Sequence, residues 1–426
     1  MKTLLCLFWV CILTCSISFG HSEPISFETE QITRGPKHHF FGYIGHVQNI
    51  PWNESGRFIL ALEIETIDRM PGADDAAQIV LLDVDDGYTP NRIDETRAWN
   101  PQQGTMFYWN PQQPDSQFFF NDRDAESGKV FTVLYDISGG LPGRRVKEYR
   151  FDDAPVGNSG VAQQGHWFMA INYGRLARLR PVTGYPESFD WTRDVAHPAD
   201  DGIFRVNIET GEKALVVSYK SLADLIRDKR PDVDEIPLFI NHTLWSRDDS
   251  RVYAFVRGGW DGSVERGKQI NVPITFRPDG SELTTHKLIG GHPEWLDGVR
   301  IIGREEKRQA IYDTSRRTVS GYLGLPDTFA NPEGDIALSP DGRWFVNGFR
   351  SVDGNRYTLY RIEDGVSATS SVFSDGGRDS GDLRIDPSPN WNRRGDAFLV
   401  PGVSDDGTRQ MYLVRFRMDA EEDSNE

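Results

Sequence analysis

Three side chains that can bind a metal occupy one position of consecutive sequence repeats. His242, His292 and Asp335 each lie three residues before the aromatic or apolar residue on which the repeats align. Two imidazoles and a carboxylate are a normal ligand set for Mn²⁺, Zn²⁺ or Fe²⁺, and Asp386, Glu333 or water can supply a fourth ligand. The pattern predicts a divalent transition-metal site, with Mn²⁺ as the first candidate and Zn²⁺ as the second. The alternative is that these polar groups bond neighbouring repeats and fill a channel with water.

A second group of candidates lies in the segment Tyr173-Gly-Arg-Leu-Ala-Arg-Leu-Arg180. Guanidinium groups bind carboxylates bidentately, so Arg175 and Arg178 are candidates for holding an acidic ligand. Tyr173 or His166 is the candidate for proton transfer. The alternative is that these arginines lie at a strand edge and pair with surface Asp and Glu.

Two segments combine aromatic rings with amides, a mixture that suits sugar binding by stacking and by hydrogen bonds to hydroxyls. They are Lys37-His-His-Phe-Phe-Gly-Tyr43 and Arg97-Ala-Trp-Asn-Pro-Gln-Gln103. The candidate ligand-binding residues, together with Arg178, are His39, Arg97, Asn100 and Gln103. The alternative is ordinary packing of the first two repeats.

The elements that must position these residues repeat roughly every fifty residues. Seven copies combine an aromatic or apolar residue, a polar turn such as Asp-Gly or Ser-Gly, and a hydrophobic strand; they begin at Trp52, Trp109, Gly165, Trp245, Trp295, Leu338 and Trp391. Positive-φ turns of this kind favour tight hairpins. The copies predict an all-β, seven-bladed β-propeller with four-stranded blades. Innermost strands of a propeller surround an axial channel, so equivalent repeat positions converge.

The segments between the copies complete the predicted blades. Seven further runs of β-forming residues begin at Gln78, Val130, Gly202, Ile270, Gln309, Tyr357 and Gln410. Residues 25–33 are a candidate outer strand for the last blade. We expect loops at 86–105, 138–165 and 177–200, and a short surface helix at 221–230.

The two termini differ in composition from the propeller segment at 21–418. Residues 1–20 combine Lys2, an apolar run and small residues before a cut near Gly20, which predicts a signal peptide and a periplasmic or secreted protein. No later run is apolar enough to span a membrane. All three cysteines lie in this leader, so the mature protein has no thiol chemistry. Residues 419–426 form an acidic tail that we expect to be disordered.

The charge balance limits the class of partner. The chain has 47 basic and 64 acidic residues and a net charge of −17, which argues against broad nucleic-acid or anionic-membrane surfaces. An acidic partner needs a local basic pocket. No phosphate-binding loop, dinucleotide fingerprint, nucleophile elbow or His-Glu-x-x-His motif stands in a supporting context. We expect a monomer.

The motif Gly291-His-Pro-Glu-Trp-Leu-Asp-Gly298 and its neighbouring blades resemble oligogalacturonate lyases, a family of seven-bladed propellers. Ser339-Pro-Asp-Gly342 resembles propeller repeats of the TolB type, and the first half is similar to ulvan-lyase-type propellers. The resemblance implies that His292 is a metal ligand. Asp335 and Asn390 depart from that pattern, because the family has histidines or other ligands there.

The resemblance also implies a reaction, metal-assisted β-elimination on uronate-containing oligosaccharides. A cation or arginine neutralises the sugar carboxylate, a base removes the neighbouring C5 proton, and an acid or water assists the leaving oxygen. The alternative is a non-catalytic propeller of the TolB or WD40 type that binds a glycan or a partner protein, because fold alone does not determine function.

Overall fold

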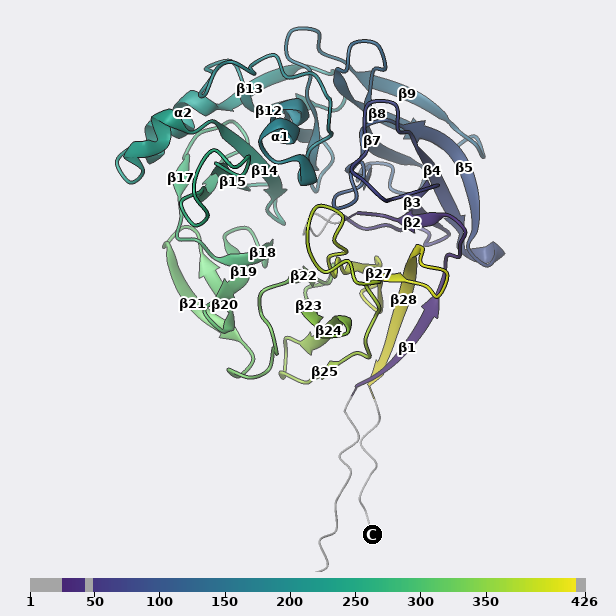
Figure 1. The fold of residues 1–426 in the computed structure, drawn as a ribbon. Coiled ribbons are helices and arrows are strands. Elements are labelled where there is room, and N and C mark those ends of the chain that lie inside the picture. The colour runs from purple at the N-terminus through teal and green to yellow at the C-terminus, as the bar shows by residue number, and fades with distance from the viewer. Residues whose placement is uncertain (1–24, 43–48, 419–426) are drawn as a thin grey trace, which may run out of the picture.

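The computed structural model describes residues 25–42 and 49–418, which form seven antiparallel four-stranded sheets arranged around a ring (Figure 1). The predicted seven-bladed β-propeller is therefore confirmed. The predicted signal peptide at 1–20, Tyr43 and the predicted disordered tail at 419–426 lie outside the described residues. No helix within these ranges is long and apolar enough to cross a membrane.

The blades follow one another in chain order, and each begins with its innermost strand. Blades 1 to 3 contain β2 (His38–Phe40), β3 (Phe58–Ile64), β4 (Ala77–Asp83) and β5 (Thr89–Thr96); β6 (Tyr108–Trp109), β7 (Gln117–Arg123), β8 (Val130–Asp136) and β9 (Arg144–Tyr149); and β10 (Gly157–Val161), β11 (Trp167–Ile171), β12 (Gly202–Asn207) and β13 (Lys213–Ser218).

Blades 4 to 7 repeat this order, and the last takes its outer strand from the N-terminal segment. They contain β14 (Leu238–Trp245), β15 (Val252–Gly258), β16 (Ile270–Phe276) and β17 (Thr284–Thr285); β18 (Gly290–Trp295), β19 (Arg300–Glu305), β20 (Arg308–Asp313) and β21 (Thr318–Leu323); β22 (Asp335–Leu338), β23 (Trp344–Ser351), β24 (Gly354–Arg361) and β25 (Ser367–Thr369); and β26 (Asn390–Trp391), β27 (Ala397–Val403), β28 (Arg409–Met418) and β1 (Ile25–Gln31).

The ring is closed by strand pairing between the two ends of the chain. β1 pairs antiparallel with β28 over its whole length, from Ile25 opposite Met418 to Gln31 opposite Tyr412 (Figure 1). The predicted outer strand from residues 25–33 is confirmed. Closure gives the first and last blades a neighbour on each side, so neither leaves a hydrophobic face exposed.

The repeated tryptophans link each blade to the blade before it. Trp295 of β18 donates its indole N–H to the Leu244 carbonyl of the preceding blade at 2.8 Å, and Trp245 donates to the Gly160 carbonyl at 2.9 Å. Trp109 and Trp391 bond the preceding blade in the same way. Each indole thus packs within its blade and satisfies a buried carbonyl of the neighbouring blade.

Two predicted loops contain strands. The segment at 86–105 contains β5, and that at 138–165 contains β9 and β10. β5 and β9 are outermost strands, so only one of their edges is paired. They carry charged residues, and β5 carries Pro90, both of which are common on edge strands and weaken the hydrophobic alternation used for prediction.

The helices belong to the third blade and the connection that follows it. α1 (Tyr173–Leu179) and the 3₁₀ turn Pro181–Thr183 interrupt blade 3 between β11 and β12. The arginine-rich segment is therefore a helix rather than a strand edge, capped by the Asn172 side chain on the N–H of Arg175. α2 (Tyr219–Ile226) confirms the predicted surface helix, shifted toward the N-terminus. The other 3₁₀ turns are Val84–Asp86 and Pro231–Glu235.

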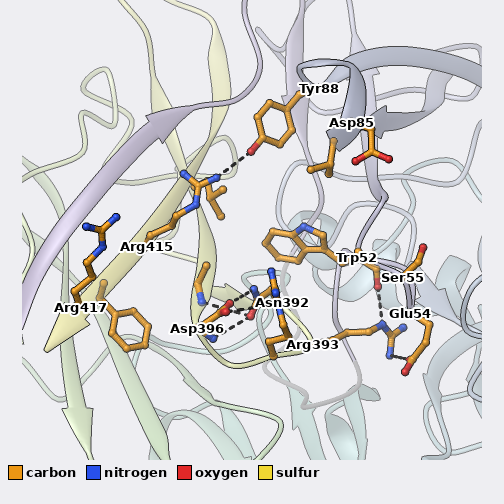
Figure 2. Close-up of a pocket in the computed structure, with 16 residues that line it drawn as sticks. Trp52, Glu54, Ser55, Asp85, Tyr88, Asn392, Arg393, Asp396, Arg415 and Arg417 are labelled. Atoms are coloured by element: carbon orange, nitrogen blue, oxygen red, sulfur yellow. Dashed lines mark hydrogen bonds and ion pairs between the residues drawn. The ribbon is translucent and has the colours of Figure 1, made fainter.

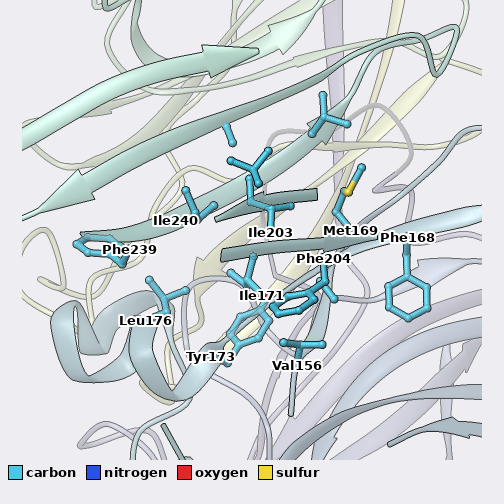
Figure 3. Close-up of a cluster of buried hydrophobic side chains, with 14 of the residues drawn as sticks. Val156, Phe168, Met169, Ile171, Tyr173, Leu176, Ile203, Phe204, Phe239 and Ile240 are labelled. Atoms are coloured by element: carbon cyan, nitrogen blue, oxygen red, sulfur yellow. The ribbon is translucent and has the colours of Figure 1, made fainter. Parts of the chain in front are cut away.

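A buried hydrophobic cluster holds α1 against blades 3 and 4 (Figure 3). Tyr173 and Leu176 of α1 contact a layer formed by β11, β12 and β14, which includes Ile171, Ile203 and Ile240. Each of these side chains is at most 2% exposed. α1 and the loop after it are therefore packed against the face of the ring where the second strands end.

Candidate functional site

A cavity of about 420 Å³ opens at the face of the ring where inner strands begin, over blades 4 to 6 and the connection from blade 6 to blade 7. Its polar lining includes His292, Asp335 and Asp386, and four arginines from three blades and that connection: Arg257, Arg304, Arg350 and Arg384. Phe255, Leu288 and Ile289 form the apolar part of the cavity wall. The cavity is large enough for a small sugar unit.

His292 and Asp335 form a direct pair at the start of adjacent inner strands. His292 Nδ1 lies 2.5 Å from Asp335 Oδ1, and Asp335 Oδ2 accepts the backbone N–H of Ser388 at 2.9 Å. Asp335 is 2% exposed, whereas the His292 side chain is 36% exposed. Desolvation opposes the charged imidazolium, but the Asp335 carboxylate outweighs it and raises the pKa of His292, and the imidazolium lowers the pKa of Asp335. The pair gives an oriented imidazole that faces a cavity.

His242 lies beside this pair because of a β-bulge. The β14–β15 register shifts between Asn241 and Thr243, and His242 between them has φ 63°. A bulge of this kind re-aims a side chain, and the left-handed backbone of a non-glycine residue marks strain that the surrounding structure must hold. The His242 ring centroid lies 5.9 Å from that of His292. Burial and the charge of His292 hold the pKa of His242 well below its usual value.

Gln103, in the connection between blades 1 and 2, contacts His242. Its amide nitrogen donates to His242 Nδ1 at 3.4 Å. The neighbouring Gln102 accepts from Arg384 Nη2 at 3.0 Å and donates to the Arg384 carbonyl at 3.0 Å. Of the residues expected to bind ligand, Gln103 is the one that contacts a predicted metal ligand, His242.

The arginines of the cavity differ in how their charges are balanced. Arg304 pairs with Glu333 at 2.8 Å, and Arg350 and Arg384 share Asp386. Arg257 donates its Nε to Asn271 Oδ1 at 2.9 Å, and among the described residues it has no ion pair with Asp or Glu. The local charge is therefore positive in a protein whose net charge is strongly negative.

The predicted metal ligands lie together but are not arranged as a three-ligand set. Within residues 25–42 and 49–418, no group of three or more His, Cys, Asp or Glu side chains is placed to hold a metal ion. Both Asp335 oxygens are engaged by His292 and Ser388. The charges next to His242 are those of His292, Arg257 and Arg180, which repel a cation. The metal on His242, His292 and Asp335 therefore stays a prediction from the sequence.

Tyr173 and Arg175 are buried away from the cavity. The Tyr173 hydroxyl donates to the Asn158 carbonyl at 2.9 Å, and its ring stacks on Tyr185 with centroids 4.3 Å apart. Burial raises the pKa of Tyr173 well above its usual value. Arg175 donates to the carbonyls of Leu238, Thr192, Val195 and Ala196. These contacts attach the loop after α1 to β14.

Arg178 and His166 also have partners outside the cavity. Arg178 Nε donates to Asp190 at 2.9 Å. His166 lies in the hairpin between β10 and β11, where its Nδ1 accepts from Gln112 at 3.0 Å. That hairpin follows an inner strand, whereas His292 and Asp335 begin inner strands, so His166 lies at the opposite face of the ring.

The remaining candidates make structural contacts. His39 bonds Gln410 at 3.1 Å and Glu63 at 3.4 Å, at the seam between blades 1 and 7. Arg97 pairs with Glu95 at 2.9 Å. Asn100 accepts the N–H groups of Gln102 and Gln103 and thereby shapes the turn that presents Gln103 to His242.

The cavity arginines were not predicted from the sequence, although three of them share one position of the repeat. Arg257, Arg304 and Arg350 lie near the ends of β15, β19 and β23, the second strands of three consecutive blades. Second strands end at the face where inner strands begin, so their last residues converge just as the first residues of inner strands do. Aligning the ends of the second strands would have found them.

A second cavity, of about 580 Å³, lies at the opposite face in the seam between blades 1 and 7 (Figure 2). Its arginines are paired with carboxylates, as Figure 2 shows for Arg393 and Glu54. The other pairs are Arg394–Asp396, Arg415–Glu30 and Arg417–Glu28. Arg415–Glu30 and Arg417–Glu28 join β28 to β1, and Arg393–Glu54 joins blade 7 to blade 1, which makes this cavity part of the ring closure.

By fold, the protein is a seven-bladed β-propeller with structural neighbours among TolB and protease propellers. TolB from Acinetobacter baumannii is 12% identical, with 85% of this chain and 82% of that chain covered and a TM-score of 0.39. The β-propeller domain of the Trilobed protease from Pyrococcus furiosus is 11% identical, with 84% and 92% covered and a TM-score of 0.47. No protein-family model and no curated protein matches the sequence. The resemblance to oligogalacturonate lyases has no support from these comparisons.

Proposed function

We propose that this chain is an exported carbon–oxygen lyase that cleaves uronate-containing oligosaccharides by β-elimination at the His292 cavity. The observation that carries the proposal is the placement of an oriented His–Asp pair among four arginines, in one cavity of an acidic protein. An anionic sugar needs positive charge to bind, and its elimination needs a base beside the bound carboxylate.

The reaction can be written with residues of this cavity. An arginine holds the uronate carboxylate, which acidifies the C5 proton next to it. The neutral imidazole of His292 takes that proton, the C4–O bond breaks as the C4–C5 double bond forms, and the leaving oxygen takes a proton from water or from the imidazolium. Asp335 is a positioning residue that holds His292 Nδ1 and stabilises the imidazolium.

This assignment replaces the roles that were expected for residues of blade 3 and α1. Tyr173 and His166 were the candidates for proton transfer, and Arg175 and Arg178 for carboxylate binding. Their hydrogen bonds lie elsewhere, whereas His292 and Arg257 face the same cavity. Proton transfer by His292 is therefore the simplest chemistry for the site.

The metal on His242, His292 and Asp335 is a separate part of the proposal. Bound Mn²⁺ or Zn²⁺ would neutralise the uronate carboxylate as a Lewis acid. Assays after treatment with EDTA, with and without added Mn²⁺, test this part alone. Loss of activity with EDTA and recovery with Mn²⁺ would confirm the metal, and unchanged activity would contradict it.

The experiment uses purified protein and a panel of pectic and ulvan oligosaccharides, with ultraviolet absorbance to detect the unsaturated uronate product. We expect absorbance to rise with at least one substrate for wild type and for Arg394→Gln, a control at the opposite face with an 84% exposed side chain. No rise with any uronate would contradict the lyase and favour the alternative of a propeller that binds a glycan or a protein.

A further inference from the structure

Two arginines next to the His292 cavity approach one tryptophan from different parts of the chain. Arg180 follows α1 directly, and Arg257 is the penultimate residue of β15. The guanidinium carbons of both lie 5.6 Å from the ring centroid of Trp260, which follows β15 and is half-buried. The loop after α1 thus brings a second positive charge to the wall that Arg257 forms.

Neither guanidinium has a carboxylate partner within residues 25–42 and 49–418, unlike Arg304, Arg350 and Arg384 in the same region. Arg257 is 9% exposed and uses its Nε on Asn271. The Nε of Arg180 is buried and has no hydrogen-bond partner in the described part of the chain. Buried charged groups are normally paired, so this pair of arginines has capacity for a ligand.

The electrostatics agree with the geometry. Burial, and after it the charge of Arg180, holds the pKa of Arg257 well below its usual value. Burial and the charge of Arg384 lower the pKa of Arg180 to about 10. Two like charges in a poorly hydrated place repel each other, and an anion that binds both removes that cost.

We infer that Arg180 and Arg257, which both lie over the ring of Trp260, form a receptor for an oxyanion of the ligand, a carboxylate or a sulfate carried by an acidic sugar. Arginine forks match the planar or tetrahedral oxygens of these groups. The inference takes its ligand class from the proposed function but does not depend on turnover.

The test is isothermal titration calorimetry of the full mature chain with glucuronate and with sodium sulfate as separate probes. Wild type and Arg394→Gln should bind at least one of them, whereas Arg180→Gln and Arg257→Gln should each weaken that binding by about tenfold or more, the effect expected for the loss of a charge-assisted hydrogen bond. Binding of glucuronate identifies a carboxylate as the group held, and binding of sulfate alone identifies a sulfated ligand.

Thermal unfolding supplies a second readout. With the probe present, the Tm of wild type should rise and that of Arg257→Gln should rise much less, while Arg257→Lys should keep part of the rise because it keeps the charge. If Arg257→Gln does not fold, Arg180→Gln carries the test, because Arg180 lies after a helix and outside the sheets.

The outcomes separate this inference from the lyase proposal. Equal affinity of wild type and both Gln variants for the probe, or no binding of either probe to wild type, would overturn the receptor, even if oligouronates are cleaved. Weaker binding in the variants without cleavage of any oligouronate by wild type would support the receptor and contradict the lyase.

Discussion

His292 Nδ1 contacts Asp335 Oδ1 at 2.5 Å across the boundary between blades 5 and 6. The two residues are 43 positions apart, and they meet because both lie in the first half of the inner strand of their blade, Asp335 as its first residue and His292 as its third. The contact fixes the orientation of an imidazole at the edge of a cavity that contains positive charge. The chemical role proposed for the site depends on this contact.

Replacing Asp335 by Asn should lower the activity by about tenfold or more and move its pH dependence. A base works in its neutral form, and Asp335 raises the pKa of His292 from 6.5, so the acid limb of kcat/KM in wild type should lie above pH 6.5. Without the carboxylate, the limb should move to lower pH. A pH profile of Asp335→Asn with the same limb as wild type would contradict the role of this pair.

Stability should fall as the pH is lowered from 6.5 toward 4, because several histidines are buried in neutral form. Burial lowers the pKa values of His38 and His286 to about 4. Between these values and 6.5, the unfolded chain binds protons that the folded chain does not, so each histidine can reduce the unfolding free energy by up to about 3 kcal/mol at pH 4. Urea unfolding across this range measures the effect.

The matched variant for that measurement is His286→Gln, whose amide can still bond the Thr275 hydroxyl, the partner of His286 Nε2 at 2.7 Å. Its stability should depend less on pH than that of wild type. Identical pH dependence of the two proteins would show that His286 is not the source.

Arg175→Gln should be strongly destabilising, by about 2 kcal/mol or more, although the side chain belongs to the arginine-rich segment that suggested ligand binding. Arg175 bonds four loop and strand carbonyls and is fully buried, so its loss leaves buried acceptors without partners. Denaturant unfolding with Arg178→Gln as the control tests this. Equal stability of Arg175→Gln and wild type would remove the structural role.

Trp295→Phe should destabilise the ring by about 1–3 kcal/mol, because it removes the N–H donor of the buried Leu244 carbonyl in the neighbouring blade. Thermal unfolding with Trp167→Phe, a partly exposed tryptophan of β11, gives the comparison. A smaller loss for Trp295 than for Trp167 would contradict the link between blades.

The blade count and the register of the inner strands were predictable because the repeat tryptophans both pack within a blade and bond the next one. His242, His292 and Asp335 were found by that register alone. The edge strand β5 was not predicted, because it is paired on one side only and carries charged residues and Pro90 instead of a clear alternation of apolar and polar residues.

The rest of the site depends on the connections between strands and blades, which have no repeat. Arg180 and Gln103 reach the cavity region from a helix end and an interblade turn, and only the folded chain shows where those segments lie. Arg175 was predicted to bind a ligand but bonds backbone carbonyls instead, and the sequence does not distinguish these two uses of an arginine.

The most direct test of the lyase is a comparison of His292→Ala with wild type on the best oligouronate of the panel, with cleavage followed by ultraviolet absorbance and binding followed by calorimetry. We expect the variant still to bind the oligosaccharide but to lose at least about a hundredfold in kcat, because the base that removes the C5 proton is gone. Cleavage by His292→Ala at the wild-type rate would rule out His292 as the base of the lyase.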